Sequence, residues 1–290
     1  MLRIQHHFAH VAACMAENDL EGQALGVSWD GTGFGPDGTV WGGEFLIAHG
    51  GAFRRFAGFR GFQLPGSSQA VREPRRSALG LLYALLGESL AARQAIPTWN
   101  AFNREERTIL LDMLKKGFHS PVTSSVGRLF DALVSISGLR QKASFEGQAA
   151  MELEYALMNA TVERSYTYAI REAPEVKVEP FYRVDWAPLF MEILADLEQG
   201  EALSAISARF HNTLAEIVVE VARLAGQDRV ALTGGCFQNR YLTERTISGL
   251  RDAGFKPYWH QRIPPNDGGI SFGQAVAAGY LPAENKPAST

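Results

Sequence analysis

Two histidines near the start of the chain have the spacing of a metal-binding pair. His6 and His10 form an HxxxH motif within IQHHFAH. On a helix, residues i and i+4 lie on one face, so both imidazoles could reach the same ion. His7 would point to another face, and we do not expect it to be a ligand. An HxxxH motif alone is also typical of two ordinary surface or core histidines, so further ligands are needed to indicate a site.

Two aspartates are candidates for those further ligands. Asp30 ends a short segment of alternating apolar residues, and Asp267 lies in the turn PPNDGG before the last apolar segment. Two carboxylates and two imidazoles suit Fe²⁺, Mn²⁺ or Zn²⁺, with coordination positions left for a substrate. Taken singly, each aspartate is more often a turn or helix-cap residue. The sequence therefore indicates a metal site only if folding brings the four residues together.

Two glycine-rich segments have the composition of phosphate-binding turns. The Gly-Thr-Gly segment at 31–33 lies at the tip of a predicted hairpin, where glycine N–H groups can approach a phosphate and the threonine hydroxyl can add a hydrogen bond. The Thr-Gly-Gly segment at 233–235 connects a predicted strand to a helix, where free N–H groups and the helix dipole favour an anion. An ordinary hairpin turn and an ordinary strand–helix connection are the alternatives.

Two acidic residues lie among apolar neighbours. Asp131 occurs in GRLFDA and Glu146 in SFEGQ. Such a setting would bury a charge, which is costly unless the carboxylate has a partner. A ribose hydroxyl or a nearby Arg or Lys would serve equally well. Cys236, which follows the second glycine segment, is interpreted as a small buried residue, since no base that could activate it is evident beside it.

The predicted elements alternate between strands and helices and indicate an α/β protein. Periodicity and turn residues predict strands at 24–30, 39–48, 52–59, 229–232 and 256–259, with a weaker strand at 177–185. They predict helices at 6–18, 77–86, 203–225, 239–253 and 269–278, and several helical stretches between 101 and 172.

The bulk composition excludes several classes of function. The 290 residues carry a net charge of -3 and are 46% hydrophobic and 20% charged, so charge gives no reason to expect nucleic acid or an anionic membrane as a partner. The two cysteines form no CxxC pair that could build a zinc knuckle. Neither a signal peptide nor an apolar run of membrane-spanning length is recognisable. We therefore expect a cytoplasmic protein.

These segments occur together, in the same order, in a known family. The chain resembles the C-terminal carbamoyl-transfer module of the HypF family of hydrogenase maturation proteins, which is related to the universal tRNA threonylcarbamoyltransferases and to antibiotic O-carbamoyltransferases. The resemblance covers nearly the whole chain and is most specific at REPRR, FEGQAAMELE and NDGGI. The tRNA enzymes share the HxxxH and the glycine turns, but usually have an SGGHT-type segment where this chain has DGTGFG.

The resemblance implies an actin/hexokinase/Hsp70-like (ribonuclease H-like) α/β fold. The chain would be its second lobe, with a large helical insertion at about 70–175, and the first lobe would be largely missing. Residues 1–22 would form the metal-ligand helix as a remnant of that first lobe. Residues 23–281 would form the nucleotide-binding lobe, and residues 282–290 a disordered tail.

The resemblance also implies a site and a reaction. A divalent metal, Fe²⁺ or Zn²⁺, would be held by His6, His10, Asp30 and Asp267. The substrate would be carbamoyl adenylate, made from carbamoyl phosphate and ATP by a YrdC-type domain. Its carbamoyl group would pass to the C-terminal cysteine thiol of HypE and later become a cyanide ligand of nickel–iron hydrogenase, so no catalytic side chain of this chain is implied. Nucleotide contacts would come from Gly31, Thr32, Gly33, Asp131, Glu146, Gly147, Gly234, Gly235 and Asn239.

The chain departs from the family pattern at its front. The family module begins with a first lobe that opens like DLHPDY, and neither this segment nor the acylphosphatase, zinc-knuckle and YrdC modules are seen in the sequence. The chain would then be a truncated gene product, a fragment or half of a split enzyme, and in the last case a partner chain would supply the missing lobe and the YrdC-type domain. An inactive nucleotide-binding scaffold, or another carbamoyl- or threonylcarbamoyltransferase, is the alternative. A sugar kinase of the same superfamily would leave the HxxxH and NDGGI segments unexplained.

The missing first lobe also leads to an expectation about the N-terminal helix. Without that lobe, Leu2, Ile4, Phe8 and Val11 would lose their natural cover. An exposed apolar patch of this kind marks an interface or an aggregation liability. We therefore expect the helix to be poorly anchored in an isolated monomer, or to be buried in a dimer or by a partner chain.

Overall fold

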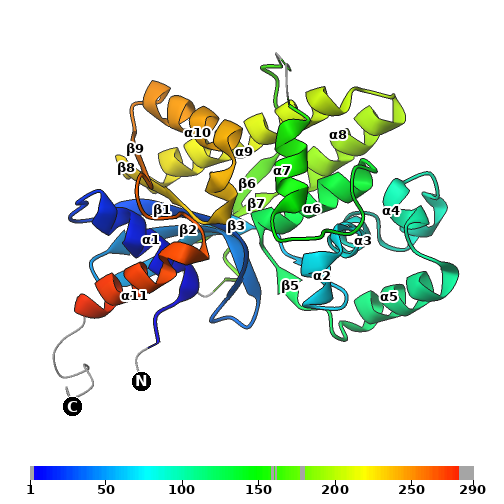
Figure 1. Cartoon of the computed structure of the whole chain (residues 1–290), viewed down its shortest axis with the longest axis horizontal. Helices are drawn as coiled ribbons and strands as arrows, with labels where there is room; N and C mark the ends of the chain where they lie inside the picture. Colours follow the sequence, from blue (N-terminus) through cyan, green and yellow to red (C-terminus); the bar gives the residue numbers. More distant parts are fainter. Residues whose placement is uncertain (1–2, 158–159, 161, 177–179, 281–290) are drawn as a thin grey trace.

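The computed structural model describes residues 3–157, 160, 162–176 and 180–280. Over these residues the chain forms a nine-stranded mixed sheet with helices packed on both faces (Figure 1). This architecture confirms the predicted α/β class. Leu2, the first part of the expected strand at 177–185 and the expected disordered tail at 282–290 lie outside the described residues.

Seven strands run in the order β6-β7-β3-β2-β1-β8-β9, while the two-residue β5 pairs with β2 and the two-residue β4 pairs with β5. The central strand β1 pairs antiparallel with β2 and parallel with β8, and β8 pairs parallel with β9. The strands are β1 (Ala24–Phe34), β2 (Val40–His49), β3 (Ala52–Phe59), β4 (Phe62–Gln63), β5 (Val122–Thr123), β6 (Ala169–Glu172), β7 (Tyr182–Asp185), β8 (Arg229–Thr233) and β9 (Lys256–Trp259).

The first and last helices, α1 and α11, lie side by side in Figure 1, while α2 to α7 gather on the other side of the molecule. The helices are α1 (His6–Glu17), α2 (Gln69–Arg72), α3 (Pro74–Leu86), α4 (Pro97–Asn100), α5 (Arg104–Lys116), α6 (Val126–Ile136), α7 (Gln148–Tyr155), α8 (Ala187–Glu198), α9 (Leu203–Ala225), α10 (Arg240–Asp252) and α11 (Ile270–Gly279). Short 3₁₀ turns occupy η1 (Gly87–Ala92), η2 (Gly235–Gln238) and η3 (Asp267–Gly269).

The sheet separates two hydrophobic cores because side chains alternate between its faces along each strand. Leu25, Val27 and Trp29 of β1 point into the larger core, which also holds the apolar faces of α3, α6 and α9. On the opposite face, Gly26 meets Val11 of α1, and the smaller core lies between the sheet, α1 and α11. The central strands are therefore covered on both sides.

Helix α1 is well packed, so the expectation that it would be poorly anchored was wrong. Phe8 and Val11, which were expected to lose their cover, are 3% and 0% exposed. The Phe8 ring stacks on Phe53 of β3 with centroids 4.9 Å apart, and Val11 lies against Gly26 of β1. Ile4 is half-buried. The cover comes from the sheet and from α11, which the sequence pattern did not pair with α1.

Two further expectations need correction. The Gly-Thr-Gly segment at 31–33 is not the hairpin tip, because β1 continues to Phe34 and the tip lies between β1 and β2. The end of the predicted helical block is also different, since residues 169–172 form β6, which pairs antiparallel with β7. Pairing with β7, the next strand along the chain, decided the second case, and the pattern of residues 169–172 taken alone does not report it.

The contact between α1 and α11 predicts a stability effect. A Cβ atom on Gly273 of α11 would lie 1.8 Å from the carbonyl oxygen of Ala9. Gly273→Ala must push the two helices apart, and we expect it to lower the free energy of unfolding by about 1–3 kcal/mol. Urea denaturation of the full chain measures this change.

The matched control is Gly279→Ala in the same helix, where an added Cβ meets open space. This change should leave stability unaltered or raise it by up to about 1 kcal/mol through helix propensity. Equal midpoints for the Gly273→Ala variant and the unaltered protein would contradict the close helix contact.

Candidate metal centre and adjoining pocket

Four side chains from three parts of the fold converge at one point. His6 and His10 come from α1, Asp30 from β1, and Asp267 from the start of η3. One ligand atom from each lies within 4.8 Å of all the others. The Nε2 atoms of His6 and His10 lie 3.1 and 3.3 Å from Asp30 Oδ2, and each lies 3.6 Å from Asp267 Oδ1. Folding thus brings together the four residues that the sequence singled out as a ligand set.

These separations fit a single divalent ion. Metal bonds to imidazole nitrogen and carboxylate oxygen are about 2.0–2.2 Å long, so two ligands of one ion are roughly 3–3.6 Å apart. Nε2 of His10 is buried and has no hydrogen-bond partner of good geometry among the described residues. That condition suits a nitrogen whose lone pair is directed at an ion. The donor set of two nitrogens and two oxygens is compatible with Fe²⁺ and Zn²⁺.

The charge at the site favours a cation. Burial acts to lower the pKa of His10, but the nearby carboxylates of Asp267 and Asp30 outweigh it and raise that pKa to about 8. Burial acts to raise the pKa of Asp30, yet the imidazoles of His10 and His6 beside it hold that pKa well below the usual range. Asp30 therefore stays ionised at neutral pH and presents a buried negative charge to the two imidazoles.

Asp30 is held at a break in strand pairing. The register of β1 with β2 shifts just after Trp29. Ser125, the N-cap of α6, donates its hydroxyl to the carbonyl oxygens of Asp30 at 2.6 Å and of Gly31 at 2.9 Å. Oδ1 of Asp30 accepts from the N–H of Gly31 at 2.8 Å and of Gly235 at 3.3 Å. The other carboxylate oxygen is left to face the histidines.

His7 lies outside the ligand set, as the helical spacing predicted. Its side chain is fully buried, and its ring centroid is 6.0 Å from that of Trp41. Burial, together with the neighbouring His6, lowers the pKa of His7 to about 3, so the ring is neutral. Gly33 packs against His6 and His7, because a Cβ there would lie 2.7 Å from Cδ2 of His6 and 2.4 Å from Cε1 of His7. Gly33 thus makes room for α1.

A pocket of about 260 Å³ opens beside the ligand set. Asp30 and Asp267 form part of its wall, so a molecule in the pocket would lie next to an ion held by them. Gln238, Asn266 and the edge of α7 contribute other parts of the wall. The pocket is also lined by several residues for which nucleotide contacts were predicted, namely Gly31, Asp131, Glu146, Gly147 and Gly235.

Arg128 is a pocket residue that the sequence reasoning missed. Its side chain is nearly buried, and its guanidinium forms an ion pair with Asp131 at 2.7 Å. The sequence left either a ribose hydroxyl or a nearby Arg or Lys as the partner of Asp131, and the structure shows Arg128 beside it. Burial and the negative charge of Glu146 raise the pKa of Asp131 to about 6, although the positive charge of Arg128 acts to lower it. The available signal was the spacing, because an arginine three residues before an aspartate shares its helix face.

The ion pair of Arg128 and Asp131 leaves some of its polar atoms without hydrogen bonds. Nε of Arg128 and Oδ2 of Asp131 are buried without a well-aligned hydrogen-bond partner among the described residues. The guanidinium also borders Gly31, where an added Cβ would come within 3.2 Å of its NH2. The pocket therefore contains a buried cation and a carboxylate that both retain hydrogen-bonding capacity.

The second predicted phosphate turn does not have free N–H groups. The N–H of Gly234 donates to the carbonyl oxygen of Pro265 at 2.9 Å, and that of Gly235 points at Asp30. Gly234 has φ 96°, and a Cβ there would lie 2.2 Å from the carbonyl oxygen of Trp29. Glycine is required at this position for close backbone packing, and the nucleotide contact predicted for Gly234 and Gly235 stays a prediction.

Asn239 is the N-cap residue of α10. It is buried, its side-chain oxygen accepts from the N–H of Leu242 at the start of α10, and its amide donates to Nε2 of His211. These hydrogen bonds use its side chain as a helix cap, and its predicted nucleotide contact stays a prediction. Thr32 is exposed on β1 and is not part of the pocket wall.

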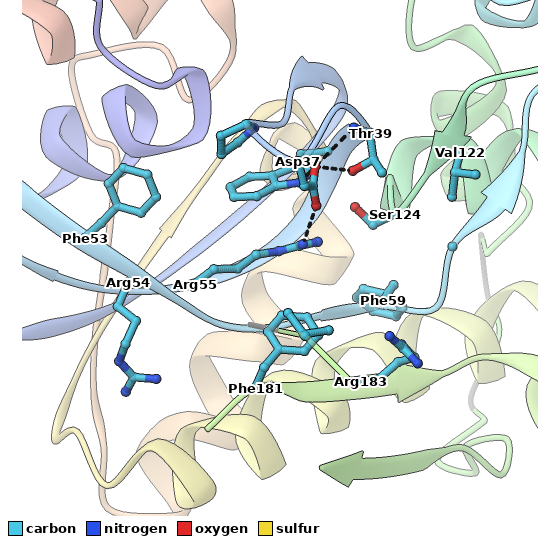
Figure 2. A pocket seen from close by; sticks show the side chains of 14 residues that line it. Asp37, Thr39, Phe53, Arg54, Arg55, Phe59, Val122, Ser124, Phe181 and Arg183 are labelled. Carbon is cyan, nitrogen blue, oxygen red and sulfur yellow. Dashed lines mark hydrogen bonds and ion pairs between the residues drawn. The ribbon is translucent and has the colours of Figure 1, made fainter. Parts of the chain in front are cut away.

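A larger cavity of about 640 Å³ lies near the β1–β2 turn and contains none of the four ligand residues. Figure 2 shows its arginine and aromatic side chains. Its charged groups already have partners: Arg55 pairs with Glu44 at 2.6 Å and with Asp37 at 3.0 Å, and Asp37 also accepts from Thr39. What remains is mainly apolar surface, so this cavity is less suited than the smaller one to a phosphate-bearing substrate.

None of the helices in the described ranges is both long and apolar enough to cross a membrane.

Comparison with known proteins identifies a family. Residues 26–274 match the family model described as carbamoyltransferase, Kae1-like domain, second subdomain.

Several characterised proteins are similar to this chain. The carbamoyltransferase HypF of Synechocystis is 39% identical over 94% of the chain and 36% of its own length. The carbamoyltransferase HypF homolog of Cupriavidus necator is 33% identical over 96% of the chain and 71% of its own length. The chain thus spans about a third of the length of the Synechocystis protein and 71% of the length of the Cupriavidus necator homolog.

Solved structures give the same result. A crystal structure of full-length HypF in the phosphate- and nucleotide-bound form matches with a TM-score of 0.88 and 38% identity, over 96% of this chain and 36% of that one. A crystal structure of T. kodakarensis HypF matches with a TM-score of 0.80 and 28% identity, over 96% of this chain and 37% of that one. These matches confirm the predicted ribonuclease H-like lobe and the predicted resemblance. The chain belongs to the HypF carbamoyltransferase family and corresponds to the second subdomain of its Kae1-like domain.

Proposed function

We propose that this chain is the metal- and adenylate-binding lobe of a carbamoyltransferase that transfers the carbamoyl group of carbamoyl adenylate to the C-terminal cysteine thiol of a HypE-type protein. The convergence of four metal-ligand side chains at the wall of a polar pocket carries this proposal. A facing lobe and the YrdC-type domain that makes the adenylate would come from other parts of a longer protein or from a partner chain. Free cysteines suit a cytoplasmic setting.

The pocket residues would bind and orient the adenylate. Arg128 offers a buried positive charge for the phosphate, and Asp131 and Glu146 offer carboxylates for ribose hydroxyls. When bound, a divalent ion such as Fe²⁺ or Zn²⁺ would polarise the carbamoyl carbonyl or the adenylate phosphate. Holding the substrate in one orientation beside the ligand residues supplies much of the acceleration in such reactions.

The acceptor thiol must come from another molecule. Cys14 and Cys236 are both buried, and burial raises the pKa of each thiol. A thiol that is buried and protonated at neutral pH is a poor nucleophile. In the proposed step, the thiolate of the acceptor attacks the carbamoyl carbon, a sulfur–carbon bond forms, the carbon–oxygen bond to phosphate breaks, and AMP leaves.

The metal site predicts a loss of affinity in one histidine variant. His10→Ala removes a buried imidazole of the ligand set and should weaken Zn²⁺ binding by more than about 100-fold, the upper range for loss of an outer-shell partner. Competition with a chromophoric chelator measures the dissociation constant. The exposed His49 on β2 provides the control, and His49→Ala should bind Zn²⁺ like the unaltered protein. Equal affinity in both variants would remove the metal site from the proposal.

The pocket predicts a contribution of Glu146 to nucleotide binding. Glu146→Gln keeps the size of this exposed side chain but removes the charge that strengthens a hydrogen bond to a ribose hydroxyl. The loss of about 1.5 kcal/mol expected for one charged hydrogen bond corresponds to roughly tenfold weaker binding of AMP. Calorimetric titration with AMP measures it, with the exposed Glu105→Gln on α5 as the control. Unchanged affinity in the first variant would contradict the ribose contact.

The reaction itself can be tested with the acceptor protein. The chain is combined with a separately supplied YrdC-type domain and first lobe, carbamoyl phosphate, ATP and a HypE-type acceptor. Mass spectrometry should show one added carbamoyl group on the C-terminal cysteine of the acceptor, and Asp267→Ala should reduce its rate of formation by more than about 100-fold. If the complete mixture gives no carbamoylated acceptor while the chain binds adenylates, the scaffold alternative is favoured.

A further inference from the structure

Glu17 is a buried carboxylate that lies outside the ligand set. It belongs to the last turn of α1, and its side chain is 2% exposed. Its Oε2 atom accepts a hydrogen bond from Nδ1 of His260 at 2.8 Å. Its Oε1 atom accepts from three successive backbone N–H groups, those of Gln261 at 3.0 Å, Arg262 at 2.5 Å and Ile263 at 3.2 Å.

This number of donors keeps the carboxylate ionised. Burial acts to raise the pKa of Glu17, but the hydrogen bonds from Arg262, His260 and the adjacent backbone lower it. A buried charge is tolerated when hydrogen bonds satisfy it, and its loss would leave three backbone N–H groups of one segment without their acceptor. Glu17 thus fastens the segment 261–263 to α1.

A second set of contacts links the same point to the backbone of a ligand residue. Nε2 of His260 lies 2.8 Å from the hydroxyl of Thr233, at the end of β8. That hydroxyl also lies 3.2 Å from the carbonyl oxygen of His10. The last turn of α1, the end of β8 and the start of the 260–267 segment are therefore joined around Glu17.

The segment that Glu17 holds leads directly to Asp267. Asp267 is the exposed member of the ligand set, with a side chain 72% exposed, whereas that of His10 is 1% exposed. Packing around the side chain therefore does little to hold Asp267, and its position depends on the backbone that carries it. That backbone is anchored by Glu17 at 261–263 and by the hydrogen bond from Gly234 to Pro265.

We propose that Glu17 is a positioning residue for the metal centre: by locking the segment 261–263 to α1, its carboxylate fixes Asp267 opposite His6 and His10. This inference rests on the metal centre proposed above. His6, His10 and Glu17 lie on one helix at spacings of four and seven residues, which place them on neighbouring positions of one face. The same helix therefore supplies two ligands and the anchor for a third.

Cobalt binding by the full chain tests the role of Glu17 through a double-mutant cycle. Co²⁺ is titrated into the unaltered protein, Glu17→Ala, Asp267→Ala and the double variant, and its visible spectrum gives both the affinity and the coordination geometry. Glu17→Ala should weaken binding by roughly 10- to 100-fold, as the loss of an outer-shell partner does. In the Asp267→Ala background the same change should alter affinity by no more than about twofold, because the residue through which Glu17 acts is gone.

Two conservative variants and one control separate positioning from general stability. Glu17→Gln keeps an oxygen for the three N–H groups and should restore most of the affinity and the spectrum of the unaltered protein. Glu17→Asp keeps the charge but is too short to reach the segment, so it should resemble Glu17→Ala. The exposed Glu21, just after the same helix, gives the charge control, and Glu21→Ala should bind Co²⁺ normally. Thermal unfolding of the metal-free variants records any loss of stability.

Each outcome distinguishes the possibilities. Equal losses of affinity from Glu17→Ala with and without Asp267 would overturn the positioning role, as would a folded Glu17→Ala protein with lower thermal stability but unchanged affinity and spectrum. If the unaltered protein binds no Co²⁺, the proposed metal centre fails and the role of Glu17 fails with it. If the unaltered protein binds Co²⁺ and the cycle is additive, the metal centre stands and this inference alone is wrong.

Discussion

An ionised carboxylate that is nearly out of water needs donors on every side, and Asp30 obtains them from three elements at once. Its own strand supplies the N–H of Gly31, the connection after β8 supplies the N–H of Gly235, and α1 supplies two imidazoles. These groups can meet only if β1 and β8 are neighbours and α1 crosses their ends. The parallel pairing of β1 with β8 and the packing of α1 on the sheet satisfy this requirement.

Helix α1 connects packing with chemistry. One side of it is apolar and lies in the smaller core, where Val11 meets the sheet and Ala9 meets Gly273 of α11. Its polar side carries His6 and His10 toward Asp30. Because α11 follows the segment that carries Asp267, the contact between the first and last helices also closes the ligand set. Stability of the core and geometry of the site therefore depend on the same interface.

The glycines around the site act mainly through steric freedom. Gly234 allows the end of β8 to pack against the backbone of Trp29, and Gly127 allows α6 to start within contact of Gly31. These close approaches bring Arg128 and Asp131 of α6 to the pocket beside Asp30. Glycine-rich segments with the composition of phosphate-binding turns thus partly serve to bring backbone segments together. The positive charge that could meet a phosphate belongs to the side chain of Arg128 on α6.

The amino-acid sequence by itself determined the local features, namely the HxxxH spacing, the hairpin of β1 and β2, the helix α9 and the alternation of strands and helices. Its motifs indicated the family. The sequence also named the four ligand residues, although only the tertiary structure brings Asp267 to α1. Tertiary structure alone decided the burial of α1 and the hydrogen bonds that join Glu17 to residues 260–263. The physical reason is that periodicity reports which face of an element is apolar, whereas hydrogen-bond partners far apart in the chain are chosen by packing.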